Sequence, residues 1–178
     1  MKLLVVRHAQ TKANEQKLIN GRSNDLISEA GRKEIPSLVQ KLRSYEFEAI
    51  YSSPLKRTME TAMPIADNHK VEIDIDRRLI EVDMGEFTQQ PHDSTVEVFG
   101  KISPDLLSTY AYDLRSYGGE SAEEVRNRVK DFIDDLKKSG HGSVLIVTHG
   151  GIIRWFYYLC SSKKINASPN LSVHPFEV

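Results

Sequence analysis

The sequence contains a single cysteine, Cys160, and no long run of hydrophobic residues. One cysteine cannot form a disulfide within the chain, which is typical of proteins in a reducing compartment. The N-terminal hydrophobic run, Leu3 to Val6, ends at Arg7, whereas a signal-peptide core needs roughly seven apolar residues or more. No later run reaches the length of a membrane span. These absences predict a soluble, cytoplasmic protein with no membrane partner.

The chain also lacks a charge excess and the motifs of several enzyme classes. Lys and Arg total 24 against 25 Asp and Glu, and the net charge of −1 argues against a nucleic-acid partner. There is no Gly-x-x-x-x-Gly-Lys loop for a nucleoside triphosphate and no Gly-x-Ser-x-Gly nucleophile elbow. The 6 histidines include no His-x-x-x-His pair. We therefore expect no metal and no organic cofactor.

Hydrophobic runs of strand length are present at regular intervals. Continuous runs at 3–6 and 144–147 predict strands that are covered on both faces. Shorter strand candidates lie at 49–51 and 71–75, and 171–178 could add an edge strand.

Helical patterns separate these strands. Hydrophobic residues recur at helical spacing in 35–42 and in 125–136, the latter after a capping box, Ser121-x-x-Glu124. Ser53-Pro54 predicts the start of a further helix that runs to about Ala66. The alternation predicts an α/β fold, a three-layer αβα sandwich with a mainly parallel central sheet and helices on both faces.

At 178 residues the chain has the size of one domain, which we place at 1–178. Residues 88–117 interrupt the alternation with Pro91, Gly100 and Pro104. In an open α/β sheet such a segment often covers the active site, so we expect a small covering insertion there.

Unusual polar residues follow three of the predicted strands directly. Arg7-His8 follows the first strand, 148–151 (Thr-His-Gly-Gly) follows the strand at 144–147, and Arg57 lies in the first turn after Ser52-Ser53-Pro54. Each alone is typical of an ordinary structural or surface residue. The carboxyl ends of parallel strands share one edge, however, so two imidazoles, two guanidiniums and helix N-termini should meet there. This combination suits a phosphoryl dianion.

These residues, together with others in the same order, resemble the histidine phosphatase superfamily, also called phosphoglycerate mutase-like. The matching segments run from residue 3 to about 154 and are Arg7-His8-Ala9, Asn14, 21–31, Ser52 to Thr58, Thr61-Ala62, Leu79 to Gly85, Gly119 to Ser121, and Thr148 to Gly151.

The resemblance implies a metal-independent phosphomonoesterase whose nucleophile is His8, which would form a phosphohistidine. Arg7, Arg57 and His149 would bind the oxygens of the phosphoryl group. The nearby guanidiniums should keep the His8 ring neutral, and a backbone carbonyl should fix its tautomer.

The resemblance also places the general acid and the substrate-binding residues. The family's Leu-x-Glu-x-x-x-Gly pattern selects Glu81 as general acid. Its neighbours Asp83 and Glu86 would then be ordinary solvated loop residues. The further substrate-binding candidates are Asn14, Asn20, Gly21 and Gly150.

The chain departs from the family pattern at three places. Ala9 replaces a glycine beside the nucleophile, and Asn20 stands where glutamine is common. The Glu-Gly pair that often follows the acid loop is absent, because residues 87–91 read Phe-Thr-Gln-Gln-Pro. The last difference concerns the leaving-group pocket and leaves the phosphate site intact.

Several alternatives remain open on the sequence alone. The expected partner is a small phosphorylated metabolite, with sugar phosphates, phosphoglycerates, α-ribazole phosphate and phosphoprotein all among the candidates. A phosphoglycerate mutase and a non-catalytic module that binds phosphorylated ligands are the competing functions. The leaving-group side could be lined by Tyr110, Tyr112, Arg115 and Tyr117, although aromatic residues in an insertion more often form a local core. Trp155 and Phe156 are better explained as core or dimer contacts than as ligands, so the sequence does not exclude a homodimer.

Overall fold

The computed structural model describes residues 1–92, 110–166 and 168–178. Its centre is a 5-stranded sheet with the strand order β3-β2-β4-β1-β5. The strands are β1 (Lys2–Arg7), β2 (Ala49–Ser52), β3 (Ile73–Ile75), β4 (Ser143–Thr148) and β5 (Val173–Glu177). The pairs β1–β4, β2–β4 and β2–β3 are parallel, whereas β5 runs antiparallel to β1. The mainly parallel sheet and the C-terminal edge strand are confirmed.

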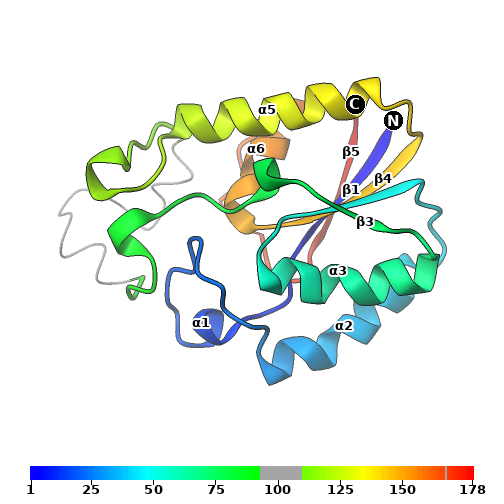
Figure 1. Cartoon of the computed structure of the whole chain (residues 1–178), viewed down its shortest axis with the longest axis horizontal. Coiled ribbons are helices and arrows are strands. Elements are labelled where there is room, and N and C mark those ends of the chain that lie inside the picture. Colours follow the sequence, from blue (N-terminus) through cyan, green and yellow to red (C-terminus); the bar gives the residue numbers. More distant parts are fainter. Residues whose placement is uncertain (93–109, 167) are drawn as a thin grey trace.

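Helices cover both faces of this sheet, so the molecule has three layers (Figure 1). One face carries α2 (Glu29–Leu42) and α3 (Lys56–His69), and the other carries α5 (Ala122–Lys138) and α6 (Gly150–Ser161). The connections contain the one-turn helix α1 (Lys12–Glu15) and the 3-10 turns η1 (Arg77–Leu79), η2 (Gly85–Phe87) and η4 (Arg115–Tyr117). The predicted three-layer α/β fold is therefore confirmed.

The central strands β1 and β4 contribute to a hydrophobic core on each side of the sheet. Successive strand residues point to opposite faces, so Leu3 and Val5 pack with α5 and α6, while Leu4 and Val6 pack with α2 and α3. Each of these side chains is at most 8% exposed. Burial of one such side chain contributes about 1.5–3 kcal/mol, which explains why both strands are continuous hydrophobic runs.

The ends of two helices test the capping predictions. The capping box of α5 is confirmed, because Ser121 Oγ accepts from the Glu124 N–H and the Glu124 carboxylate accepts from the Ser121 N–H. The predicted start of α3 is wrong by two residues: the helix begins at Lys56, and its N-cap, Leu55, offers no side-chain cap. Ser53 does not cap the helix because its backbone still follows β2 and its hydroxyl contacts His149.

Most of the predicted insertion, residues 93–109, lies outside the described residues. The part that follows contributes to a local core, as expected for its aromatic residues. Tyr112 is 3% exposed, and its hydroxyl accepts a hydrogen bond from Trp155 Nε1 over 3.3 Å. Arg115 instead pairs with Asp113 at the surface.

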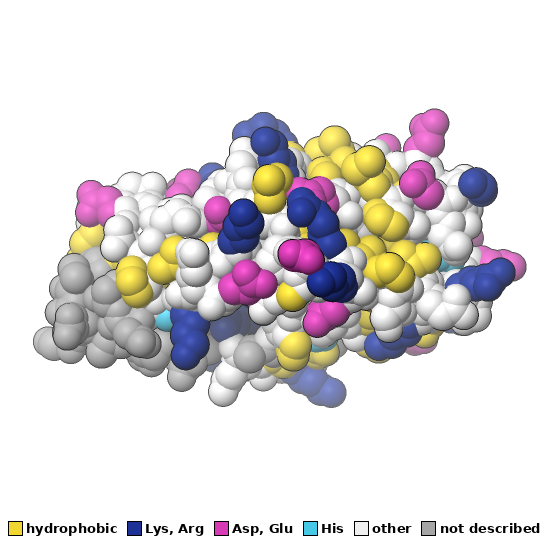
Figure 2. All heavy atoms as spheres, turned by 90° about the horizontal axis from the view of Figure 1, so that it is seen from below, with side chains coloured by type: hydrophobic (Ala, Val, Ile, Leu, Met, Phe, Trp, Pro, Cys, Tyr) yellow, Lys and Arg dark blue, Asp and Glu magenta, His cyan; other side chains and the backbone are white. Residues whose placement is uncertain are grey.

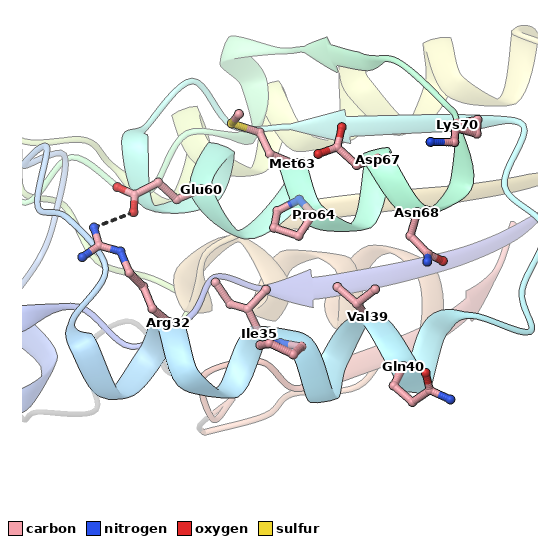
Figure 3. A pocket seen from close by; sticks show the side chains of 11 residues that line it. Arg32, Ile35, Val39, Gln40, Glu60, Met63, Pro64, Asp67, Asn68 and Lys70 are labelled. Atoms are coloured by element: carbon pink, nitrogen blue, oxygen red, sulfur yellow. Dashed lines mark hydrogen bonds and ion pairs between the residues drawn. The ribbon is translucent and has the colours of Figure 1, made fainter.

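The face formed by α2 and α3 carries hydrophobic side chains among acidic and basic ones (Figure 2). A groove of about 990 Å³ runs between the two helices (Figure 3). Ile35 and Val39 of α2 face Met63 and Pro64 of α3 across it, and the Arg32–Glu60 ion pair bridges one end. None of the candidate site residues lines this groove. Within the described residues, no helix is long and apolar enough to cross a membrane.

Candidate active site

The parallel register of the sheet brings the candidate residues together at one edge. Arg7, the last residue of β1, is paired with Thr148, the last residue of β4, and so His8 and His149 leave the sheet side by side. Their ring centroids are 5.2 Å apart, with the ring planes tilted by 60°. Both rings are buried, at 2% and 0% exposure. The two histidines therefore share one enclosed site, as the strand-end argument predicted.

The ring of His8 is fixed by its own backbone. Nδ1 lies 2.7 Å from the carbonyl oxygen of Ala9, so this nitrogen carries the proton and donates it, and Nε2 is left with a free lone pair. The Ala9 N–H donates in turn to Thr61 Oγ1 of α3 over 3.0 Å. Burial, and then the charges of Arg57 and Arg7, hold the pKa of His8 well below 6.5. The result is a neutral imidazole of defined tautomer.

His149 is fixed by two side chains from the neighbouring strand and helix. Arg57 Nε donates to its Nδ1 over 3.3 Å, and its Nε2 lies 2.8 Å from Ser53 Oγ. Because Nδ1 accepts, the ring proton must be on Nε2, which donates to Ser53. Burial and the Arg57 charge also hold the pKa of His149 well below 6.5.

The guanidiniums of Arg57 and Arg7 lie close to these rings. Arg57 is 0% exposed, and its two terminal nitrogens donate to the carbonyls of Ser23 and Gly21, 2.5 and 2.7 Å away. Burial lowers its pKa to about 10, so it stays charged at neutral pH. Arg7 donates through Nη1 to the Ser168 carbonyl. Its Nε is buried and has no hydrogen-bond partner among the described residues.

The unpartnered Arg7 Nε lies beside the N-terminus of α6. A Cβ built on Gly150 would be 3.5 Å from this nitrogen, which places the guanidinium against the first residue of the helix. A buried donor without an acceptor costs about 1–3 kcal/mol, more when it is charged. The orphaned donor and the positive end of the helix dipole together favour an anion at this position.

Glu81 approaches the same helix end from the loop after η1. Its carboxylate accepts from the N–H of Val82 over 2.9 Å and from the N–H of Gly151 over 3.3 Å. Its backbone carbonyl accepts from Arg22 Nε and Arg128 Nη2, at 3.2 and 3.3 Å. The carboxylate is thereby held against the N-terminus of α6, on a loop that two arginines anchor.

The neighbouring Asp83 has a structural role that differs from the predicted one. It forms an ion pair of 3.1 Å with Arg22 and accepts from the Gly85 N–H over 3.0 Å. It is therefore part of the loop's framework, and the expectation of an ordinary solvated residue is wrong for it.

The candidates Asn14, Asn20 and Gly21 bond to residues of the same region. Asn14 Oδ1 accepts from the Thr11 N–H over 3.1 Å, and the Thr11 hydroxyl donates to Asn20 Oδ1 over 2.9 Å. Gly21 has φ +47°, a conformation that favours glycine, and it orients the carbonyl that binds Arg57. Thr11 therefore links Asn14 to Asn20, and the next residue, Gly21, bonds to Arg57.

A comparison with protein families identifies the chain. The model of the histidine phosphatase superfamily (branch 1) matches residues 3–178. The chain belongs to this superfamily.

Individual relatives agree with the family assignment. Phosphoserine phosphatase 1 of Hydrogenobacter thermophilus is 32% identical over 168 residues, which cover 88% of this chain and 74% of the relative. The phosphoglycerate mutase of Bacillus anthracis has a solved structure that is 26% identical, with a TM-score of 0.84 and coverage of 98% and 86%. A mycobacterial glucosyl-3-phosphoglycerate phosphatase has the same fold, at 22% identity, a TM-score of 0.88 and coverage of 98% and 90%. The family and these relatives together support a phosphatase.

Sequence reasoning missed several residues of this histidine phosphatase site. The sequence predicts a helix cap at Ser53 and includes it in the matching segment Ser52 to Thr58 without a role at the site, although that segment was a usable signal. Thr61 was included in a matching segment without a role. Ser168 and Asn170 contact Arg7 and the His8 carbonyl, and no motif pointed to them. In the described part of the chain, no group of three or more His, Cys, Asp or Glu residues could hold a metal ion.

Proposed function

We propose that this phosphatase hydrolyses small phosphomonoesters in two steps through a phosphohistidine on His8. The observation that carries the proposal is the state of the His8 ring. Its Nδ1 is committed to the Ala9 carbonyl and its pKa is well below 6.5, so Nε2 is an unprotonated nucleophile at neutral pH. A second imidazole and two guanidiniums lie around it.

In the first step, His8 Nε2 attacks phosphorus and the bond from phosphorus to the ester oxygen breaks. The leaving oxygen takes a proton from Glu81 and departs as an alcohol. Charge on the phosphoryl oxygens is stabilised by Arg7, by Arg57, which donates through Nε to His149, and by the N-terminus of α6 at Gly150. The Nε of Arg7, which has no hydrogen-bond partner among the described residues, is available for one of these hydrogen bonds.

In the second step, water attacks the phosphohistidine and Glu81 takes a proton from it. The N–P bond breaks, inorganic phosphate leaves, and the Nε2 lone pair of His8 is restored. Each turnover consumes one phosphomonoester and one water and yields one alcohol and one phosphate. No step needs a metal ion or an organic cofactor.

The site residues around this centre have supporting roles in the proposal. Asn14 and Asn20 shape the loop that faces the phosphoryl group, and Gly21 provides the carbonyl that orients Arg57. Phosphoserine is the first substrate to test, because the relative from Hydrogenobacter thermophilus is named for it.

The test is hydrolysis of an aryl phosphate, with and without a chelator, by the wild type and by His8→Ala. We expect turnover that survives chelation and a loss of at least about 10³-fold on substitution, since the nucleophile is removed. A phosphorylated protein that is labile in acid and stable in alkali would show the intermediate. Turnover that survives His8→Ala, or that requires a divalent ion, would refute the mechanism.

A mutase is the second candidate, because a phosphoglycerate mutase is among the structural relatives. It would pass the phosphoryl group from His8 to a second hydroxyl instead of to water. Phosphate release and isomer formation from 3-phosphoglycerate, measured in the same sample, distinguish the two.

A non-catalytic binding module would bind phosphomonoesters and release no phosphate. The homodimer and the cytoplasmic location stay predictions, and sedimentation of the purified chain tests the first.

A further inference from the structure

A polar cluster lies behind the nucleophile and has no part in the chemistry described above. His174 of β5 contacts Tyr157 of α6 through Nδ1, at 3.0 Å from the hydroxyl. Its Nε2 lies 2.9 Å from Ser168 Oγ and 2.8 Å from Ser172 Oγ. His174 is the partner of Val5 in the sheet, two residues before Arg7. The cluster therefore joins α6, β5 and the segment 168–172 directly beside the strand that ends in the active site.

One set of hydrogen-bond directions satisfies this cluster. The Tyr157 hydroxyl donates to His174 Nδ1, and the Nε2–H of His174 donates to the serine hydroxyls. Ser172 Oγ then donates to the Pro169 carbonyl, 2.5 Å away. Burial, and then the charge of Lys41, lower the pKa of His174, which keeps the ring in this neutral form. The segment 168–172 is thereby tied at both ends to a fixed imidazole.

The same segment contacts the two residues at the end of β1. Asn170 Nδ2 donates to the His8 carbonyl over 2.9 Å and lies 3.4 Å from Asn14 Oδ1. The Arg7 N–H donates to the Ser172 carbonyl over 3.1 Å, and the Ser168 carbonyl accepts from Arg7 Nη1. Both the nucleophile's backbone and the phosphate-binding guanidinium are thus held by one short stretch of chain.

The backbone of this segment is strained, which indicates that its position is strongly determined. Leu171 has φ +56°, a left-handed conformation that a branched side chain rarely adopts. Its N–H donates to the Arg7 carbonyl over 3.1 Å. Such strain persists only where the surrounding contacts enforce it, and it concentrates at functional sites.

We propose that residues 168–172 position the catalytic groups, with Asn170 setting the backbone of His8, Ser168 setting the guanidinium of Arg7, and His174 fixing the segment itself. The proposal rests on the proposed function of His8. Asn170 holds the peptide plane between His8 and Ala9, and the Ala9 carbonyl in the next peptide orients the His8 ring, so a shift of the held plane moves both the ring and its acceptor. Ser168 occupies Nη1 of Arg7 through its carbonyl and leaves Nε available to the phosphoryl group of the proposed reaction. These are positioning residues, since none of them contacts the phosphorus.

The main test is Asn170→Asp, which keeps the shape of the side chain and replaces the donor with an acceptor next to the His8 carbonyl. We expect kcat to fall about 10–100-fold with KM changed less than about threefold, because misplacement of a reacting group by about 1 Å can cost 10²-fold. The rate of phosphoenzyme formation in a single turnover should fall by the same factor. The matched control is Asn166→Asp, the same chemical change at an exposed residue two positions before the segment. It should retain wild-type kcat.

A second pair of variants tests the attachment of the segment. His174→Phe keeps a ring against Tyr157 but removes both nitrogens, whereas His174→Gln keeps a polar group that can donate to the serines. We expect His174→Phe to lose more kcat than His174→Gln, although both retain the fold. A merely structural role would lower the thermal midpoint of the two variants without this order in kcat.

Three outcomes would overturn the proposal: wild-type kcat in Asn170→Asp, a change confined to KM, or an equal loss in Asn166→Asp. His8→Ala, measured in the same assay, distinguishes a failure of the positioning role from a failure of the proposed function. An inactive His8→Ala beside a fully active Asn170→Asp refutes the positioning role alone. An active His8→Ala refutes the mechanism on which the role depends.

Discussion

The backbone of Gly151 lies directly against the carboxylate of Glu81. The Gly151 N–H donates to Oε2 over 3.3 Å, and a Cβ on residue 151 would overlap Oε1 and lie 2.9 Å from Val82 Cγ2. Gly151 does not have a positive φ, so contact and not conformation requires glycine here. The second glycine after His149 therefore provides the space in which the proposed general acid sits.

Gly151→Ala tests this relationship. The new methyl group should push the Glu81 carboxylate out of place, while the fold is retained because the end of a flexible side chain can move. We expect kcat to fall about 10²-fold, the lower end of what a general acid contributes. Steady-state kinetics and a thermal melt measure the two effects. Gly150→Ala should lose less, since its Cβ would meet Arg7 at an ordinary contact distance of 3.5 Å; equal losses in the two variants would contradict the argument.

Ser53→Ala tests the orientation of His149. The substitution removes the acceptor of the His149 Nε2–H, 2.8 Å away, and leaves a buried donor unpaired. We expect kcat/KM to fall about 10–100-fold, as for other residues that orient a functional imidazole, with a stability loss of about 1–3 kcal/mol. Ser52→Ala is the matched control, because Ser52 is equally buried and its hydroxyl donates to a backbone carbonyl. An unchanged kcat/KM in Ser53→Ala would show that His149 needs no such partner.

The pKa values of the two buried histidines predict how stability depends on pH. His8 and His149 have pKa values well below 6.5 in the folded chain, whereas the unfolded chain binds protons near pH 6.5. Below about pH 6.5 the unfolded state therefore holds more protons, and the free energy of unfolding decreases as the pH falls. The contribution is fully present above that pH. Urea unfolding from about pH 7.5 to 5 should show this decrease, and it should be smaller in His8→Gln, which cannot take up the proton.

The lowered pKa of His8 also predicts how kcat/KM depends on pH on the acidic side. Because the His8 ring stays neutral well below pH 6.5, kcat/KM should not fall with an apparent pKa near 6.5. A substrate whose phosphate does not titrate in this range isolates the effect. A fall in kcat/KM centred at pH 6.5 would contradict the lowered pKa of His8.

The anchoring of the acid loop gives a prediction on stability. Glu120 forms ion pairs of 2.7 Å with Arg22 and 3.0 Å with Arg128, and its carboxylate accepts from the Asp83 N–H. Glu120→Ala should lower the free energy of unfolding by about 1–3 kcal/mol, less than for a fully buried network because the side chains are partly exposed. Kinetics should show a lower kcat, since residues 81–83 lose their anchor.

Asp134→Ala provides the comparison for Glu120→Ala. Its pair with Lys130 is an exposed pair one helical turn apart, for which the expected change is about 0–0.5 kcal/mol. Urea denaturation of both variants measures the difference. Equal changes would mean that the Glu120 network is no more than a surface ion pair.

The sequence alone was sufficient for the layers of the fold and for the edge of the sheet at which the candidate residues meet. Hydrophobic runs at 3–6 and 144–147 are local signals, and polar residues directly after them must meet at one edge once the strands are parallel. That reasoning predicted the proximity of His8 and His149 correctly. It misplaced the start of α3, because the sequence does not show whether the Ser53 hydroxyl caps a helix or forms a hydrogen bond with a neighbouring side chain.

Only the tertiary structure decided which groups orient the chemistry. Asn170 and Ser168 contact residues about 160 positions away in the chain, and Glu81 is held by arginines from two other segments. A hydrogen bond between distant residues leaves no period or spacing in the sequence, since it depends on where the folded backbone brings them. The sequence therefore determined which chemical groups reach the edge of the sheet, and the packing of distant segments determined the directions in which those groups point.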